Sequence, residues 1–63
     1  MMDAIEALII ELDGKIEQLK EALASGRSAT FEEYRHMCGE IRGLLTARGY
    51  ALDLKQRMEN SDE

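Results

Sequence analysis

The sequence predicts an all-α protein, a two-helix antiparallel hairpin of the coiled-coil kind. Three observations predict this fold: a heptad pattern of apolar residues, two capping boxes that each open a helix, and a glycine between the two helical segments. The 63 residues include no proline, and one third of them are charged. Alanine, leucine, glutamate, lysine and arginine, which lose little rotamer freedom in a helix, agree with this fold class.

The first helix is expected at about residues 3–25. Asp3 is its expected cap, because Asp-Ala-Ile-Glu has the spacing of a capping box in which Glu6 reaches back. The apolar residues that follow alternate in steps of four and three, which is the repeat of a coiled-coil seam. They are Ile5, Ile9, Leu12, Ile16, Leu19 and Leu23. We therefore expect these side chains to form this helix's half of the hairpin core.

The turn is expected at residues 26–30. Gly26 stands where a left-handed glycine commonly ends a helix, and Thr30 with Glu33 forms a second capping box. A connection this short makes consecutive helices antiparallel neighbours. The second helix is then expected at about residues 31–58, with an acidic tail at 59–63.

The second helix has a broader apolar stripe than the first. Its expected core residues are Tyr34, Cys38, Ile41, Leu45 and Leu52. A flanking row contains Met37, Leu44, Ala51 and Met58 at steps of seven. This breadth favours contact with more than one neighbour. Gly49 offers a possible break, but the apolar pattern resumes in register after it, so we predict one continuous helix.

A ladder of small residues runs along the second helix at steps of four: Gly39, Gly43, Ala47 and Ala51. Its two glycines together cost about 2 kcal/mol of helix propensity relative to alanine, which the close approach of a partner backbone would offset. We therefore predict a docking surface at these four residues and at Ile10, which lies outside the first helix's seam. The alternative is that the glycines, or Ile10, are simply tolerated on a solvent-exposed face.

The chain is short for a self-sufficient core. Chains below roughly 70 residues rarely bury enough apolar area without a disulfide, a metal or a partner. A single cysteine excludes an intramolecular disulfide, and no Cys/His cluster offers a structural metal site. We therefore expect multiple copies, with the hairpin completed by oligomerisation or by docking on a larger assembly.

Few residues offer catalytic or ligand chemistry. His36 and Cys38 are two residues apart and point to different sides of a helix, so they form neither a metal site nor a nucleophile–base pair. We expect no enzyme activity, cofactor or metal. The net charge of −5 argues against direct nucleic-acid binding, which needs clustered basic residues. The longest apolar run, 7–10, is far below the roughly 20 residues that span a membrane, and no basic region precedes it, so no signal peptide is expected.

One stretch supports a family resemblance. It reads Tyr34-x-x-x-Cys38-Gly39-x-Ile41-x-Gly43-Leu44-x-x-Ala47, followed by Asp53-Leu54 and Met58-Glu59. With the preceding Ile-x-x-Leu helix and the serine/glycine turn, it resembles small helical-hairpin accessory proteins encoded among tailed-bacteriophage virion-morphogenesis genes. The resemblance covers nearly the whole chain, although Gly49-Tyr50 replaces a more helix-favouring pair. It implies a virion structural or assembly accessory, assembled in the bacterial host cytoplasm, whose partners are itself and other virion proteins.

Two other hypotheses remain open. The first is a small acidic phage regulator or inhibitor, such as a nucleic-acid mimic that binds a host protein. A mimic should present carboxylates continuously along one face, whereas acidic and basic residues intermix here, as in Glu40-Ile41-Arg42. The second is a free-standing coiled-coil dimer in which the first helix's seam pairs between chains.

Overall fold

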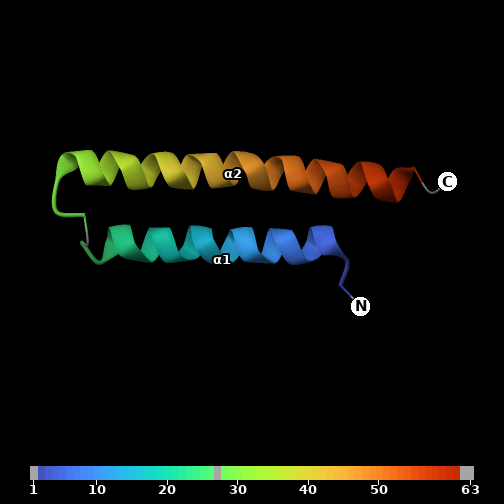
Figure 1. Ribbon diagram of the computed structural model, residues 1–63, viewed down its shortest axis with the longest axis horizontal. Helices are drawn as coiled ribbons and strands as arrows, with labels where there is room; N and C mark the ends of the chain where they lie inside the picture. Colours follow the sequence, from blue (N-terminus) through green and yellow to red (C-terminus); the bar gives the residue numbers. More distant parts are fainter. Residues whose placement is uncertain (1, 27, 62–63) are drawn as a thin grey trace.

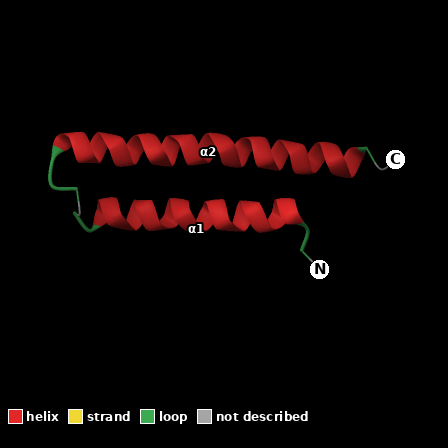
Figure 2. Ribbon diagram, viewed as in Figure 1, coloured by secondary structure: helices red, strands yellow, loops and turns green. Residues whose placement is uncertain are grey.

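The computed structural model describes residues 2–26 and 28–61. These residues form two antiparallel helices, α1 (Ala4–Ala24) and α2 (Phe31–Asn60), side by side along most of their lengths (Figure 1). No strand occurs within the two described segments (Figure 2). The backbone measures 51 × 20 × 12 Å, and α2 projects beyond α1 at both ends (Figure 1). The predicted all-α hairpin is confirmed.

Helix α1 begins and ends where its capping residues predict. The Asp3 side chain accepts a hydrogen bond from the Glu6 backbone N–H at 2.8 Å, which satisfies one of the free donors of the first turn. Ser25 caps the other end and donates its backbone N–H to the Glu21 carbonyl at 2.9 Å. Gly26 follows with a φ of 76°, the left-handed conformation that glycine adopts most readily.

Helix α2 is also capped as predicted at its start. The Thr30 hydroxyl accepts from the Glu33 backbone N–H at 3.0 Å, while the Glu33 carboxylate accepts from the Ala29 N–H at 2.9 Å. The reciprocal contact thus reaches one residue further back than a standard capping box does. The helix continues through Gly49, so the prediction of one continuous helix is confirmed.

The C-terminal end of α2 differs from the prediction. Glu59 and Asn60 belong to the helix and not to the expected acidic tail. The cause is a cap further along: the Ser61 backbone N–H donates to the Arg57 carbonyl at 3.0 Å, and its hydroxyl donates to the Met58 carbonyl at 2.9 Å. Arg27 of the predicted turn, and residues 62–63 of the predicted tail, lie outside the described residues.

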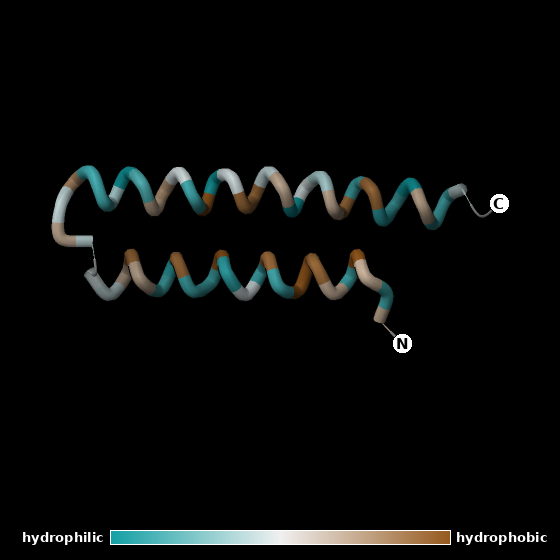
Figure 3. Tube along the Cα trace, in the orientation of Figure 1, coloured by the Kyte–Doolittle hydropathy of each residue, from teal (hydrophilic) through white to brown (hydrophobic). Residues whose placement is uncertain are grey.

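The core lies along the line where the helices meet. Its most buried side chains are Ile16, Leu19, Ala22 and Ala51, each no more than 9% exposed. The rest of the α1 seam is half-buried: Ile5, Ile9, Leu12 and Leu23. Figure 3 shows these apolar positions recurring on the side of α1 that faces α2. The predicted seam of α1 is therefore confirmed, and it packs against α2 of the same chain.

The core face of α2 is partly different from the prediction. Tyr34, Leu45 and Leu52 are 47%, 51% and 40% exposed, so their assignment to the core is wrong for this hairpin. Cys38 and Ile41 are half-buried. The residues of α2 that face α1 are all buried or half-buried: Met37, Ile41, Leu44, Arg48, Ala51 and Lys55. Three of them, Met37, Leu44 and Ala51, belong to the row predicted to flank the stripe, whose fourth member, Met58, is 53% exposed.

Two adjacent apolar rows on α2 explain this difference. Cys38, Leu45 and Leu52 each follow a member of the core row by one residue, which turns them about 100° around the helix. The core row itself includes Arg48 and Lys55 where apolar residues would be expected. Long basic side chains can bury their aliphatic stems while their charged groups reach solvent, so these positions remain part of the seam.

Candidate protein-interaction surface

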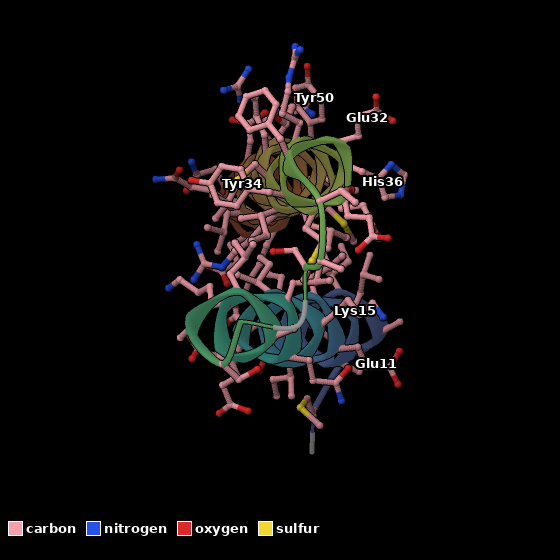
Figure 4. All side chains as sticks on the ribbon, turned by 90° about the vertical axis from the view of Figure 1, so that its left-hand side faces the viewer. Glu11, Lys15, Glu32, Tyr34, His36 and Tyr50 are labelled. Carbon is pink, nitrogen blue, oxygen red and sulfur yellow. The ribbon has the colours of Figure 1, made fainter. Side chains whose placement is uncertain are left out.

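An apolar stripe of α2 remains uncovered on one broad side of the hairpin. It consists of Tyr34, Cys38, Leu45 and Leu52, at steps of four, seven and seven that keep side chains on one side of a helix. Figure 4 shows Tyr34 on this side, and His36, Lys15 and Glu11 on the opposite broad side. We call the side that carries the stripe the Tyr34 face.

Aromatic residues extend the stripe at the turn end. The Phe31 ring is 71% exposed and stacks on Tyr34 with a centroid separation of 6.4 Å. The Arg35 guanidinium lies 6.0 Å from the Phe31 ring centroid, within the range of a cation–π interaction. A hydrogen bond with the Cys38 side chain raises the pKa of Tyr34 above its ordinary value. The phenol of Tyr34 is therefore neutral at physiological pH.

An ion pair between Asp13 and Arg48 lies at the border between the hairpin core and the Tyr34 face. Arg48 belongs to the core row of α2, three residues after Leu45 and four before Leu52. Its Nε donates to the Asp13 carboxylate of α1. Among the described residues, it is the one ion pair that joins the two helices. Because the two side chains are 47% and 36% exposed, solvent screening limits the contribution of the pair to stability to about 0–1 kcal/mol.

Sequence analysis did not find this ion pair. The apolar pattern of α2 skips Arg48, which stands between Leu45 and Leu52. Opposite charges at two seam-flanking positions were the available signal. Using that signal requires the alignment of the two helices, which depends on the length of the turn and not on the pattern of either helix alone.

Charge is distributed unevenly across the Tyr34 face. The α1 edge carries Glu6, Ile10, Asp13, Glu17 and Lys20, at steps of four, three, four and three. The α2 edge carries Arg35 and Arg42; both line one shallow hollow with Tyr34 and Cys38. Asp53 lies on the same side of α2 as Arg35, because 18 residues make five full turns. The face thus has an apolar stripe on α2 between two edges that each carry charges of both signs.

The predicted small-residue docking surface is only partly available. Gly39, Gly43 and Ala47 are exposed, and a Cβ added at either glycine would meet no atom within 4 Å. Ala51 is 8% exposed and packs in the core, so its assignment to a docking surface is wrong for this hairpin. The reason is geometric: each four-residue step advances about 40° around the helix, which carries the ladder from solvent into the core.

The predicted docking residues also do not gather on one side. Gly43 is seven residues after His36 and therefore shares its side of α2, opposite the Tyr34 face (Figure 4). Ile10 is 56% exposed and lies between Glu6 and Asp13 along the α1 edge of the Tyr34 face. The structure thus separates Ile10 from the ladder with which the sequence grouped it.

Two further properties concern ligands and membranes. Across residues 2–26 and 28–61, no group of three or more His, Cys, Asp or Glu side chains is placed to hold a metal ion. Neither described helix is long and apolar enough to cross a membrane.

No protein-family model, curated protein or solved structure matches this chain. No residue role therefore carries over from a relative, and function has to be inferred from the exposed faces of the hairpin.

Proposed function

We propose that this chain is a non-enzymatic structural or assembly protein that acts by packing its helices against other protein chains. One observation carries the proposal: among the described residues, ten large apolar side chains are at least 40% exposed, against four apolar residues that are buried. Scattered exposed apolar residues are ordinary, but apolar residues that recur along one side of a helix, as in the stripe of the Tyr34 face, favour a protein-interaction site.

The size of the core supports the same proposal. No described side chain is less than 2% exposed, so even the innermost residues of the hairpin lie near solvent. Covering apolar surface stabilises a protein by roughly 25 cal/mol per Å² removed from water. A partner packed on the stripe would therefore supply burial that the two helices cannot give each other.

We extend the proposal to a tailed-phage particle because residues 34–47 resemble the phage accessory proteins described above. In this proposal the chain is a multi-copy virion component that docks on itself and on other virion proteins. Exposed apolar side chains are useful to such a component, because they are covered as the particle assembles.

Mass spectrometry of purified particles tests this extension directly. Particles of the phage that encodes the chain should contain it at a copy number that fits a symmetric ring or shell. Assembly intermediates purified from the infected host provide a second sample, since an assembly accessory can leave before maturation. Absence from both the particles and the intermediates would contradict the proposal of a virion role.

The alternative of an acidic regulator or nucleic-acid mimic has less support. Its best candidate surface is the acidic α1 edge of the Tyr34 face. Asp13 is paired there with Arg48, and the Glu17 carboxylate lies 3.4 Å from the Lys20 ammonium group. These cations divide the edge, whereas a nucleic-acid mimic needs an unbroken row of free carboxylates.

A further inference from the structure

We propose that a second copy of this chain covers the Tyr34 face end for end, so that the α2 stripes of the two copies pack on each other around a two-fold axis that runs across the helices. This inference rests on the proposed function and deepens it by naming the partner and its register. Its evidence is the symmetry of α2 about its middle, the opposite charges that this symmetry brings together, and the area of the face.

The apolar stripe of α2 is symmetric about Leu45. Cys38 lies seven residues before Leu45 and Leu52 lies seven residues after it, so the three side chains lie on nearly the same side of the helix. The helix spans Phe31–Asn60, and its midpoint falls between residues 45 and 46. Two antiparallel copies of α2 with Leu45 on the two-fold axis therefore overlap over their whole length. Cys38 of each copy then packs on Leu52 of the other, and the two Leu45 side chains pack on each other.

The charged edge of α2 is centred at nearly the same place. Arg35 and Asp53 lie on one edge of α2, and the midpoint between them is residue 44. A two-fold axis across the helices sets each edge beside the same edge of the other copy and reverses its direction. Arg35 of each copy therefore lies beside Asp53 of the other. Arg57 of the same helix contacts Oδ2 of Asp53 at 3.0 Å, and Oδ1 can accept a hydrogen bond from Arg35 of the other copy.

The α1 edge is also complementary in this arrangement. The Asp13–Arg48 contact between antiparallel helices places Ile16 level with Leu45, so the axis crosses α1 near Ile16. Lys20 lies four residues after Ile16 and Asp13 three residues before it, so Lys20 of each copy meets Asp13 of the other. The two Glu17 carboxylates approach each other near the axis. The Lys20 ammonium group, 3.4 Å from Glu17 within each copy, reduces their repulsion.

A two-fold axis parallel to the helices is disfavoured. It would set the apolar stripe of one copy against the α1 edge of the other, and so bury Leu45 against carboxylates. It would also leave Tyr34 beyond the end of α1. In the antiparallel arrangement Tyr34, eleven residues before Leu45, meets Gln56, eleven residues after it, in the other copy. The Gln56 amide can form a hydrogen bond with the phenol as the ring is covered.

The Tyr34 face is large enough for a stable dimer. It is one of the two broad sides of a hairpin whose backbone measures 51 × 20 × 12 Å (Figure 4). A face of 51 × 20 Å has about 1,000 Å², against the roughly 800 Å² that each partner contributes to a standard protein interface. Full overlap of the two α2 helices uses the long dimension of this face, including the end of α2 that projects beyond α1 at the turn (Figure 1).

A disulfide cross-link in the full chain tests the register. Leu45→Cys in a Cys38→Ala background should give a disulfide-linked dimer under mild oxidation, because residues on the axis lie within the roughly 4–7 Å between Cα atoms that a disulfide spans. The wild-type chain should not cross-link, since its two Cys38 residues would be fourteen positions, or about 21 Å, apart along the helices. Gly43→Cys in the same background is the matched control, because Gly43 lies on the opposite broad side. Non-reducing electrophoresis measures the linked fraction.

A charge exchange tests the contacts at the edge by sedimentation equilibrium. Arg35→Glu and Asp53→Arg should each weaken self-association about tenfold, because each places two like-charged contacts in a symmetric dimer. The double variant restores opposite charges and should return association to near the wild-type constant. Lys15→Glu and Glu11→Arg are the matched controls: they make the same charge changes on the opposite broad side (Figure 4) and should leave association unchanged.

Each other outcome overturns a distinct statement. A dimer that Leu45→Cys does not link, or that Gly43→Cys links equally well, would show that the copies meet through a different face. Failure of the double charge variant to recover, with its helices intact by circular dichroism, would overturn the antiparallel register. A wild-type chain that stays monomeric would overturn the second copy as partner. Detection in purified particles would then still support the proposed function, so the two failures are distinguishable.

Discussion

The two helices of this hairpin use their apolar residues differently. All six seam residues of α1 are buried or half-buried, and they face α2. In α2 the seam includes Arg48 and Lys55, while Tyr34, Leu45 and Leu52 lie one row away and are exposed. Helix α1 thus places most of its apolar surface inside the chain, and α2 presents a large part of its own to the outside.

This difference is the reason for proposing that α2 packs on a second neighbour besides α1. A helix that packs on a single partner needs an apolar stripe about one seam wide, as α1 has, whereas a helix of a bundle needs an additional adjacent row. Helix α2 has that additional row, and only the first of its two rows is covered within the hairpin. Matched substitutions in one helix and then in the other test this comparison.

The largest effect is expected from emptying the α1 core. Ile16→Ala should lower the free energy of unfolding by about 2–5 kcal/mol, because it removes a side chain that is 5% exposed. That is a large part of the roughly 3–9 kcal/mol expected for a chain of this size. Thermal and denaturant unfolding followed by circular dichroism measure it, and an unchanged midpoint would contradict the seam of α1.

Leu45→Ala is the matched variant on α2. In dilute solution it should cost less than about 1 kcal/mol, because Leu45 is already 51% exposed and alanine favours a helix slightly. At concentrations where copies associate, the cost should grow with the loss of interface burial. The same cost at every concentration would show that the outer row of α2 has no partner in solution.

The N-terminal capping residues should contribute about equally to the stability of the two helices. Asp3→Ala and Thr30→Ala each remove a side chain that accepts a backbone N–H, at 2.8 and 3.0 Å, and each should cost about 1 kcal/mol. Urea unfolding of the two variants measures the costs. If Asp3→Ala alone were costly, the start of α2 would be held by the turn and not by its cap.

A smaller and opposite effect is expected at Gly43. Because an added Cβ meets no atom there, Gly43→Ala should raise the free energy of unfolding by up to about 1 kcal/mol. Self-association through the Tyr34 face should be unaffected, since Gly43 lies on the other side of α2. Gly43→Leu adds a larger side chain at the same position. If it abolished self-association while helical content was preserved, the docking surface would be the small-residue ladder.

The smallest effect is expected at the ion pair between the helices. Asp13→Asn removes the charge while nearly keeping the shape, and it should cost no more than about 1 kcal/mol because both partners are partly solvated. Raising the salt concentration should reduce the difference from wild type. A cost well above this range would mean that the pair is more buried in solution, as it would be inside a dimer.

Most of the fold could be predicted from the sequence, because local signals specify it. Asp3, Thr30 and Gly26 determine where the helices begin and end. Each of them acts on backbone groups only a few residues away in the sequence. The α1 seam was also predictable, since its steps of four and three continue without a break over six residues. The α2 core was not predictable, because either of two adjacent apolar rows could face α1, and the turn determines which of them does. Arg48 and Lys55 also belong to the seam, although a basic residue gives no apolar signal in the sequence.

The candidate surface was predictable only in part for a related reason. Ile10 was recognised as lying outside the α1 seam, but its place beside Glu6 and Asp13 depends on which side of α1 faces α2. The ladder that begins at Gly39 was read as one face, although its four-residue steps turn gradually into the core. Sequence periodicity therefore identified the unusual residues, and the packing of the two helices determined which of them share a surface.

The dependence of the unfolding midpoint on protein concentration tests the central claim most directly. If the hairpin is completed by a second copy, the thermal midpoint of the wild-type chain should rise steadily between roughly 1 and 100 µM, because association stabilises only the folded state. Leu45→Ala should flatten that rise. A wild-type monomer that unfolds cooperatively with the same midpoint across this range would contradict the claim, since the two helices would then suffice without a partner.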